Sequence, residues 1–163
     1  MCNTSSSTGH GTFIFEDADA GLDERWHEGG LPSKAGLHNR QTIQVPFAFQ
    51  APASGIGDKG AHEVLWYERR GVGDLRTERR THALLLRFGA VDYEATVWLN
   101  GIHVGYHRGG HVPFDVDLSP ALAQDGDVQG EEFRITVRVR DSPSDLTQPR
   151  GKQHWKPVSQ EIF

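Results

Sequence analysis

Apolar and polar residues alternate along several stretches of this chain, with the period of two that half-buried β-strands show. The cleanest alternation is FRITVRVRD, residues 133–141. It predicts an inward apolar set and an outward polar set: Phe133, Ile135, Val137 and Val139 against Arg134, Thr136, Arg138 and Arg140. Further strands are predicted at TFIFED (12–17), TIQVPFAF (42–49, where Pro46 stops the strand or places it at an edge), VLWYERR (64–70) and HALLLRFG (82–89).

A β-hairpin is predicted where EATVWLN (94–100) and IHVGYH (102–107) flank the dipeptide Asn100-Gly101. Asn-Gly favours a two-residue type I′ turn, because both central residues need a positive φ. Pairing outward from this turn puts Leu99 opposite Ile102 and Val97 opposite Val104 on one face. Trp98 then lies across from His103 on the other face. This register predicts one buried face.

The remaining stretches are turns, loops and one short helix. Residues 17–32 are turn-rich and are expected to reach the core through Trp26 and Leu31. DLSPAL predicts a helix that Ser119 or Asp117 caps, with Pro120 in the first turn. Residues 51–61 form a loop, and residues 1–11 are expected to be a disordered tail. Short alternating strands with little helix predict an all-β fold, an antiparallel sandwich.

Composition narrows the class of protein. The 163 residues carry a formal charge of −5, which does not favour a nucleic-acid partner. The single cysteine, Cys2, allows no internal disulfide. The first residues lack the basic and apolar regions of a signal peptide, and no apolar run is long enough to span a bilayer. We therefore expect a cytoplasmic protein with no membrane partner.

Three histidines recur at a spacing of four, His103, His107 and His111. On a helix this spacing would suit a zinc site, but the nearby glycines and Pro113 exclude a helix here. On a strand His103 and His107 would share a face, and His111 would lie beyond the Gly109-Gly110 turn. We expect neither a metal site nor a cofactor.

Two carboxylate pairs are candidates for acid–base chemistry, Asp115 with Asp117 and Glu131 with Glu132. The first pair leads into the predicted helix and can serve its cap. The second precedes a strand and reads as a solvated turn. The chain also lacks a phosphate-binding P-loop and a nucleophile-elbow pentapeptide. We therefore assign no catalytic residue.

The segment PRGKQHW combines charge, amide and aromatic groups: Arg150, Lys152, Gln153, His154 and Trp155. Sugar recognition uses an aromatic ring against C–H faces and directional hydrogen bonds to hydroxyls. A loop that docks on a neighbouring domain would use the same residue types. The residues alone leave these two interpretations open.

Five stretches in this order resemble the N-terminal sugar-binding domain of glycoside hydrolase family 2: FEDADAGLDERWHEGGLP, IQVPFAFQ, VLWYERR, LLLRFGAVDYEATVWLNGIHVGYHRGGHVPFDVDLSPAL and VRVRDSPSDLTQPRGKQHW. The family includes β-galactosidases, β-glucuronidases and β-mannosidases. The similarity runs from Thr12 to Phe163 and implies one domain, a jelly-roll β-sandwich, that stops one strand short of the family pattern. It also implies that the Gly109-Gly110 turn and the Pro113-Phe114 anchor are structural.

The resemblance also implies a role. In this family an immunoglobulin-like domain and a TIM barrel follow, and the barrel carries the two glutamates that hydrolyse β-glycosides with retention. The chain alone is thus expected to be inactive. In related enzymes a loop near the end of the domain contributes an acidic side chain to substrate hydroxyls, and Glu161 is the nearest acidic residue to that place. Candidate substrate-binding residues are therefore Glu161, Arg150, Lys152, Gln153 and Trp155.

Two hypotheses follow. In the first, the chain is the non-catalytic N-terminal domain of a family 2 β-glycosidase, shaping one wall of the carbohydrate pocket and helping the enzyme assemble. In the second, it is a free-standing carbohydrate-binding module on the same scaffold. Measurable sugar affinity without a partner would distinguish the second from the first.

Overall fold

The computed structural model describes residues 9–33, 40–73, 75, 83–124 and 132–149. Its strands are β1 (Gly9–Phe15), β2 (Gln41–Val45), β3 (Val64–Val72), β4 (Leu85–Phe88), β5 (Glu94–Leu99), β6 (Ile102–Arg108), β7 (Phe114–Asp117) and β8 (Glu132–Arg140). Its helical turns are α1 (Trp26–Gly29), η1 (Pro52–Ser54) and α3 (Ser119–Gln124). Among the described residues, no helix is long and apolar enough to cross a membrane.

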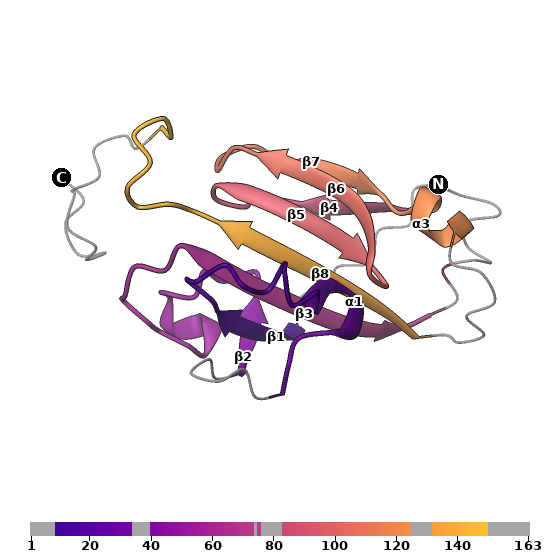
Figure 1. The fold of residues 1–163 in the computed structure, drawn as a ribbon, viewed down its shortest axis with the longest axis horizontal. Helices are drawn as coiled ribbons and strands as arrows, with labels where there is room; N and C mark the ends of the chain where they lie inside the picture. The colour runs from indigo at the N-terminus through magenta and orange to yellow at the C-terminus, as the bar shows by residue number, and fades with distance from the viewer. Residues whose placement is uncertain (1–8, 34–39, 74, 76–82, 125–131, 150–163) are drawn as a thin grey trace.

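In the described part of the chain, eight strands form two antiparallel sheets that pack face to face (Figure 1). The larger sheet has the order β2-β1-β3-β8-β5-β6, and the smaller one pairs β4 with β7. Long-range pairing dominates: β8 lies between β3 and β5, far from both in sequence. The prediction of an all-β antiparallel sandwich is confirmed.

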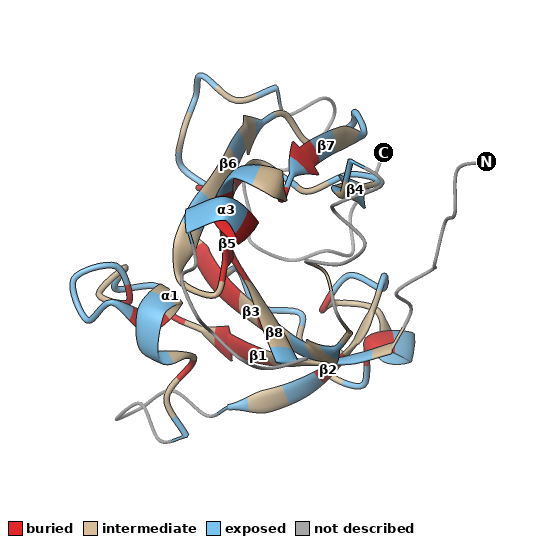
Figure 2. Ribbon diagram, turned by 90° about the vertical axis from the view of Figure 1, so that its right-hand side faces the viewer, coloured by how far each residue is buried: buried red, intermediate tan, exposed pale blue. Residues whose placement is uncertain are grey.

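The main core lies between the two sheets. Inward side chains of the large sheet meet the small sheet and the buried face of α3; the fully or nearly fully buried members include Phe13, Ile43, Leu65, Ala95, Val97, Leu99, Val116, Leu122, Val137 and Val139. Figure 2 shows the buried residues concentrated in the central strands. The inward set predicted for 133–139 belongs to this core or packs against it.

The outer face of the large sheet is also covered, which the alternation did not predict. The segment 17–33 crosses it and adds Trp26 and Leu31 to a second apolar cluster, whose other members are Ile14, Val64, Trp66 and Trp98. Thr136 and Arg138, expected to face solvent, are therefore only 0% and 8% exposed. Trp26 and Leu31 are the anchors predicted from the sequence, and both are buried.

The hairpin forms as predicted at its tip but not beyond it. Asn100 and Gly101 have φ values of 51° and 88°, and Leu99 pairs with Ile102 and Trp98 with His103. A β-bulge then shifts the register, so Val97 lies opposite Gly105 rather than Val104. The bulge brings a glycine under β7, where a Cβ atom would be 2.9 Å from Val116. A larger residue would not fit there.

Element ends follow local chemistry. β2 stops at Val45, one residue before Pro46, and lies at the edge of its sheet, as the sequence indicated. β1 begins at Gly9, so residues 9–11, expected in the tail, belong to the sheet. Helix α3 begins at Ser119, whose backbone amide donates to Asp117 Oδ1 at 2.8 Å. Asp117 is thus the capping group of the two that were considered.

Candidate functional site at the end of the six-stranded sheet

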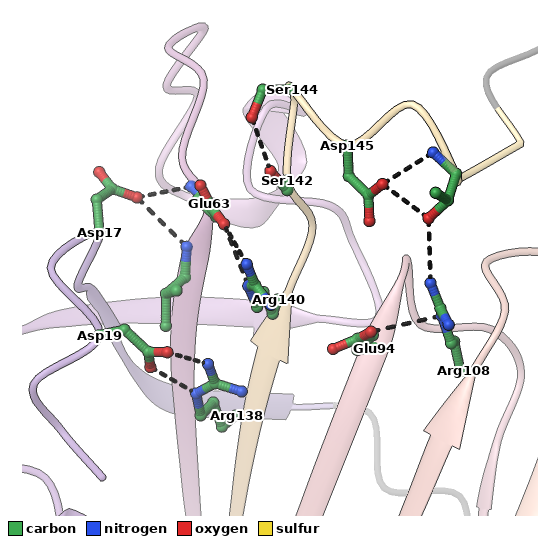
Figure 3. Close-up of polar contacts among 12 residues, drawn as sticks. Asp17, Asp19, Glu63, Glu94, Arg108, Arg138, Arg140, Ser142, Ser144 and Asp145 are labelled. Carbon is green, nitrogen blue, oxygen red and sulfur yellow. Dashed lines mark hydrogen bonds and ion pairs between the residues drawn. The ribbon is translucent and has the colours of Figure 1, made fainter. Parts of the chain in front are cut away.

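The substrate-binding residues predicted from the sequence, Arg150, Lys152, Gln153, Trp155 and Glu161, lie outside the described residues. The structure does describe the chain that leads to them. After β8 it runs through residues 141–149, at the end of the sheet where β3 begins and β6 ends. That end of the sheet is the candidate site (Figure 3).

Asp17 joins the end of β1 to the start of β3. Its Oδ1 accepts hydrogen bonds from the backbone amides of Glu63 at 2.6 Å and Val64 at 3.3 Å, and its Oδ2 lies 2.9 Å from His62 Nδ1. The His62 ring in turn stacks on Phe15, with centroids 3.8 Å apart. One carboxylate therefore fixes both the backbone and an aromatic contact at this end of the sheet.

Two arginines of β8 are each paired with a carboxylate. Arg138 donates from Nε to Asp19 at 2.8 Å and from Nη2 to its second oxygen, a two-point contact (Figure 3). Arg140 donates to Glu63 Oε1 from Nε at 3.1 Å and from Nη2 at 3.0 Å. The hydrogen bond to Glu63 raises the pKa of the Arg140 guanidinium. These pairs link β8 to the start of β3 and to segment 17–33, which covers the outer face of the sheet.

Residues 141–149 are held by a backbone bond to Glu63 and by contacts within the segment. The Asp141 amide donates to the Glu63 carbonyl at 2.9 Å, and the hydroxyls of Ser142 and Ser144 lie 3.2 Å apart. Asp145 Oδ1 accepts from the Thr147 amide at 2.8 Å and from its hydroxyl at 2.7 Å. A side chain that bonds to the backbone two residues on closes a tight turn. The Asp145–Thr147 turn is therefore set by hydrogen bonds within the segment.

A bond to β6 places this turn against the sheet. Arg108 Nη2 donates to the Thr147 hydroxyl at 3.5 Å, and Arg108 Nε lies 3.4 Å from Glu94. The guanidinium also lies over the Tyr93 ring, 5.2 Å from its centroid. Arg108 thus links the turn, β5 and an aromatic ring.

Tyr106 is an exposed aromatic side chain beside these charges that the sequence reasoning missed. It precedes Arg108 by two residues on β6 and is 57% exposed. Burial, followed by the negative charge of Glu94, raises the pKa of its phenol. An exposed ring next to a carboxylate and a guanidinium is chemically suited to a polar ligand such as a sugar. The sequence offered one indication of this, an aromatic residue at a solvent-facing position of β6.

The histidines do not converge. The bulge puts His103 on the outer face, against the edge of Trp98, and His107 on the inner face, stacked on Phe114 with centroids 4.0 Å apart. The expectation that the two share a face is wrong because one residue is inserted between them. In the described part of the chain, no group of three or more His, Cys, Asp or Glu side chains could hold a metal ion.

The candidate acid pair on β7 has structural partners. Asp115 makes a two-point contact with Arg87 of β4, at 2.7 Å for each bond, and the bond to Arg87 lowers the pKa of its carboxyl. Asp117 accepts from the Ser119 amide. Glu132 is exposed at the start of β8, and Glu131 lies outside the described residues.

The chain is similar to part of several β-glucuronidases. No family model matches the chain. It is 39% identical to a β-glucuronidase of Felis catus over 144 residues, which are 83% of this chain and 20% of that protein, and 39% identical to one of Mus musculus over 137 residues. The chain is homologous to part of these β-glucuronidases and resembles the N-terminal domain of glycoside hydrolase family 2.

Solved structures of a β-glucuronidase also match the chain. A β-glucuronidase from Ruminococcus gnavus, in complex with a C6-substituted uronic isofagomine, matches with a TM-score of 0.64 and 25% identity, over 84% of this chain and 21% of that one. The same enzyme in complex with D-glucuronic acid matches with a TM-score of 0.62 and 26% identity, over 84% of this chain and 22% of that one. The chain spans about a fifth of the length of the curated relatives it matches.

Proposed function

We propose that this chain is the non-catalytic N-terminal domain of a retaining β-glycosidase that acts on β-glucuronides. The supporting observation is that its similarity to β-glucuronidases covers 83% of the chain but only 20% of the β-glucuronidase it matches. The domain would work beside an immunoglobulin-like domain and a TIM barrel, the arrangement that family 2 resemblance implies. It would shape one wall of the carbohydrate pocket and help the enzyme assemble.

Retaining hydrolysis needs one carboxyl group to protonate the leaving oxygen and a second, about 5 Å away, to attack the anomeric carbon. The carboxylates described at the candidate site already hold structural partners: Asp17, Asp19, Glu63, Glu94 and Asp145. We therefore assign the acid and the nucleophile to the barrel, as the family resemblance implies.

The part of this domain nearest the reaction would be the segment from residue 150 onward. The turn built by Asp145 and Thr147 and held by Arg108 sets where that segment starts. Arg150 would pair with the substrate carboxylate, since guanidinium and carboxylate match in two-point geometry. Glu161 would accept from sugar hydroxyls, and Trp155 would stack on a sugar face. Lys152 and Gln153 would add a charge and directional hydrogen bonds.

A hybrid enzyme tests this proposal. The chain replaces the corresponding domain of the Ruminococcus gnavus β-glucuronidase, and hydrolysis of p-nitrophenyl β-glucuronide and β-galactoside is measured. We expect turnover of the glucuronide by the hybrid and none by the isolated 163-residue chain. In the hybrid, Glu161→Gln should lower kcat/KM at least tenfold, whereas Arg87→Gln, far from the segment in sequence and paired with Asp115, should leave it unchanged.

Two outcomes would overturn the proposal. Glucuronide turnover by the pure chain would place the acid and nucleophile within it. Millimolar or tighter binding of glucuronate, galactose or mannose to the isolated chain, measured by isothermal titration, would instead support the free-standing carbohydrate-binding module.

A further inference from the structure

Exposed apolar side chains gather at the end of the sheet that carries the candidate site. Among the described residues, seven large apolar side chains are exposed, and three of them lie here: Tyr106 at 57%, Val112 at 52% and Leu146 at 71%. Single exposed apolar residues are ordinary on a protein surface, whereas neighbouring ones mark interaction sites.

Arg108 lies between two of these side chains. Tyr106 precedes it by two residues on β6, so the two side chains share a face of the strand. On its other side, Leu146 is next to Thr147, whose hydroxyl accepts a hydrogen bond from Arg108 at 3.5 Å. Figure 3 shows Arg108 reaching from β6 toward this turn. An aromatic and an aliphatic side chain therefore flank one guanidinium group.

The charges at this end of the sheet are already neutralised in pairs. Arg108 Nε lies 3.4 Å from Glu94, and Arg140 Nη2 lies 3.0 Å from Glu63. Glu94 also hydrogen-bonds with the side chain of Tyr106. Covering a charge that keeps its partner costs less than covering a lone one. Apolar side chains around paired charges are suited to contact with another protein surface.

The path of the chain indicates which protein surface that is. Residues 141–149 leave β8 at this same end and lead to residue 150. Any domain attached beyond this point is tethered beside Tyr106 and Leu146, and a tether gives it a high effective concentration there. The similarity takes up only 20% of the Felis catus β-glucuronidase, so that relative has much more protein to place.

We propose that Tyr106, Arg108 and Leu146 form a docking surface for a following domain of the same polypeptide, a partner with a largely apolar face. The inference rests on the proposed function, because it takes the chain to be one domain of a longer enzyme. Tyrosine and arginine are residue types that contribute most to such interfaces. Docking there holds the turn at Thr147 against β6, and so fixes where the segment from residue 150 departs.

Cysteine labelling of the hybrid with the Ruminococcus gnavus β-glucuronidase tests this surface. Tyr106→Cys and Leu146→Cys are introduced one at a time with Cys2→Ser, which removes the only cysteine of the chain. The rate of alkylation by iodoacetamide is compared between the hybrid and the isolated 163-residue chain, with peptide mass spectrometry to identify each site. We expect alkylation to be roughly tenfold slower in the hybrid at both positions, because a covered side chain reacts only when the contact opens.

Leu85→Cys is the matched control. Leu85 is 56% exposed, close to the value for Tyr106, but lies on β4 of the other sheet. Its alkylation should be equally fast in both proteins. Stability gives a second readout: Leu146→Ser should lower the melting temperature of the hybrid and leave that of the isolated chain unchanged. Leu85→Ser should change neither.

Glucuronide turnover by the hybrid separates this inference from the proposed function. If the hybrid is active but the introduced cysteines react as fast as in the isolated chain, the docking surface is wrong and the proposed function stands. Slow alkylation in an inactive hybrid would support the surface and count against the substrate. Neither turnover nor slowing would count against both. Slow alkylation in the isolated chain that becomes faster on dilution would assign the surface to a second copy of this chain instead.

Discussion

The side-chain oxygen of Asn100 accepts a hydrogen bond from the backbone N–H of Arg134 at 2.8 Å. The backbone N–H of Asn100 donates to the Arg134 carbonyl at the same distance. The tip of the β5–β6 hairpin is thereby fastened to the start of β8. Asn100 serves two purposes, because it also holds the positive φ of the turn.

Replacing Asn100 by alanine should lower the free energy of unfolding by about 2 kcal/mol. Roughly half comes from alanine in the left-handed region and half from the unsatisfied Arg134 amide. Asn100→Gly keeps the backbone freedom and loses only the side-chain acceptor, so it should cost about 1 kcal/mol. Urea denaturation of both variants measures the two parts. Equal losses would show that the hydrogen bond alone matters.

Gly105 should be intolerant of even a methyl group. Its Cβ would lie 2.9 Å from a methyl carbon of Val116 on the facing sheet, and such overpacking costs about 1–3 kcal/mol. Adding Val116→Ala to Gly105→Ala makes room, so the double variant should be more stable than the sum of the two single losses predicts. Gly89→Ala is the matched control, since no atom lies within 4 Å of its Cβ position. Thermal unfolding measures all four.

Asp19→Asn should destabilise the domain by about 2 kcal/mol, because it leaves the Arg138 guanidinium, 9% exposed, without its counter-charge. Asparagine suits the positive φ of Asp19, so the change tests charge and not backbone conformation. Combining it with Arg138→Met removes the unpaired cation and should restore most of the loss. If the double variant were no more stable than Asp19→Asn, charge pairing would not be the reason.

His27 should make stability fall in mild acid. Burial, the largest influence, lowers its pKa below the usual 6.5, while Glu28 raises it and Arg25 and Arg134 lower it further. The unfolded chain therefore binds a proton more readily than the folded one. The stability that neutral His27 contributes is complete above pH 6.5 and is lost as the pH falls through 6.5 toward the lower folded pKa.

Denaturation midpoints of the unaltered chain and His27→Gln between pH 5 and pH 8 check this linkage. The variant should have a shallower dependence on pH in that range, because one group with different pKa values in the two states has been removed. An identical slope in both proteins would show that other groups are responsible for it. The ring of His27 stacks on Trp98, so loss of this contact is expected to lower stability at every pH.

The sequence predicted where the strands lie better than it predicted which of their faces are covered. Alternation and the Asn100-Gly101 turn placed β3, β5, β6 and β8, because each depends on residues close together in the chain. The covered outer face was not predictable, since Arg138 is buried by Asp19 and by a segment more than a hundred residues away. Arginines at alternate positions of a strand normally face solvent. Only the tertiary structure reveals the carboxylate that pairs with a buried one.

The candidate site shows the same division. Its local turns, such as Asp145 with Thr147, follow the Asx pattern readable in the sequence. Its long-range pairs, such as Arg140 with Glu63 and Arg108 with Thr147, depend on a register that the sequence does not contain. The residues next to Val97 and Trp98 did not indicate the bulge either. The bulge places Gly105 against Val116 of the facing sheet, and that contact is seen only in the folded structure. The roles of Arg150, Lys152, Gln153, Trp155 and Glu161 stay predictions.

The cover over the outer face has a kinetic consequence. Hydrogen bonds join this segment, residues 17–33, to β8. Arg134 bonds to His27 across 107 positions, and Arg138 bonds to Asp19 across 119. Closing such long loops carries a large entropy cost before any contact repays it. The tryptophans beneath should consequently stay accessible to water until β8 has docked between β3 and β5. During synthesis, that stage is reached only after the ribosome has released residue 140.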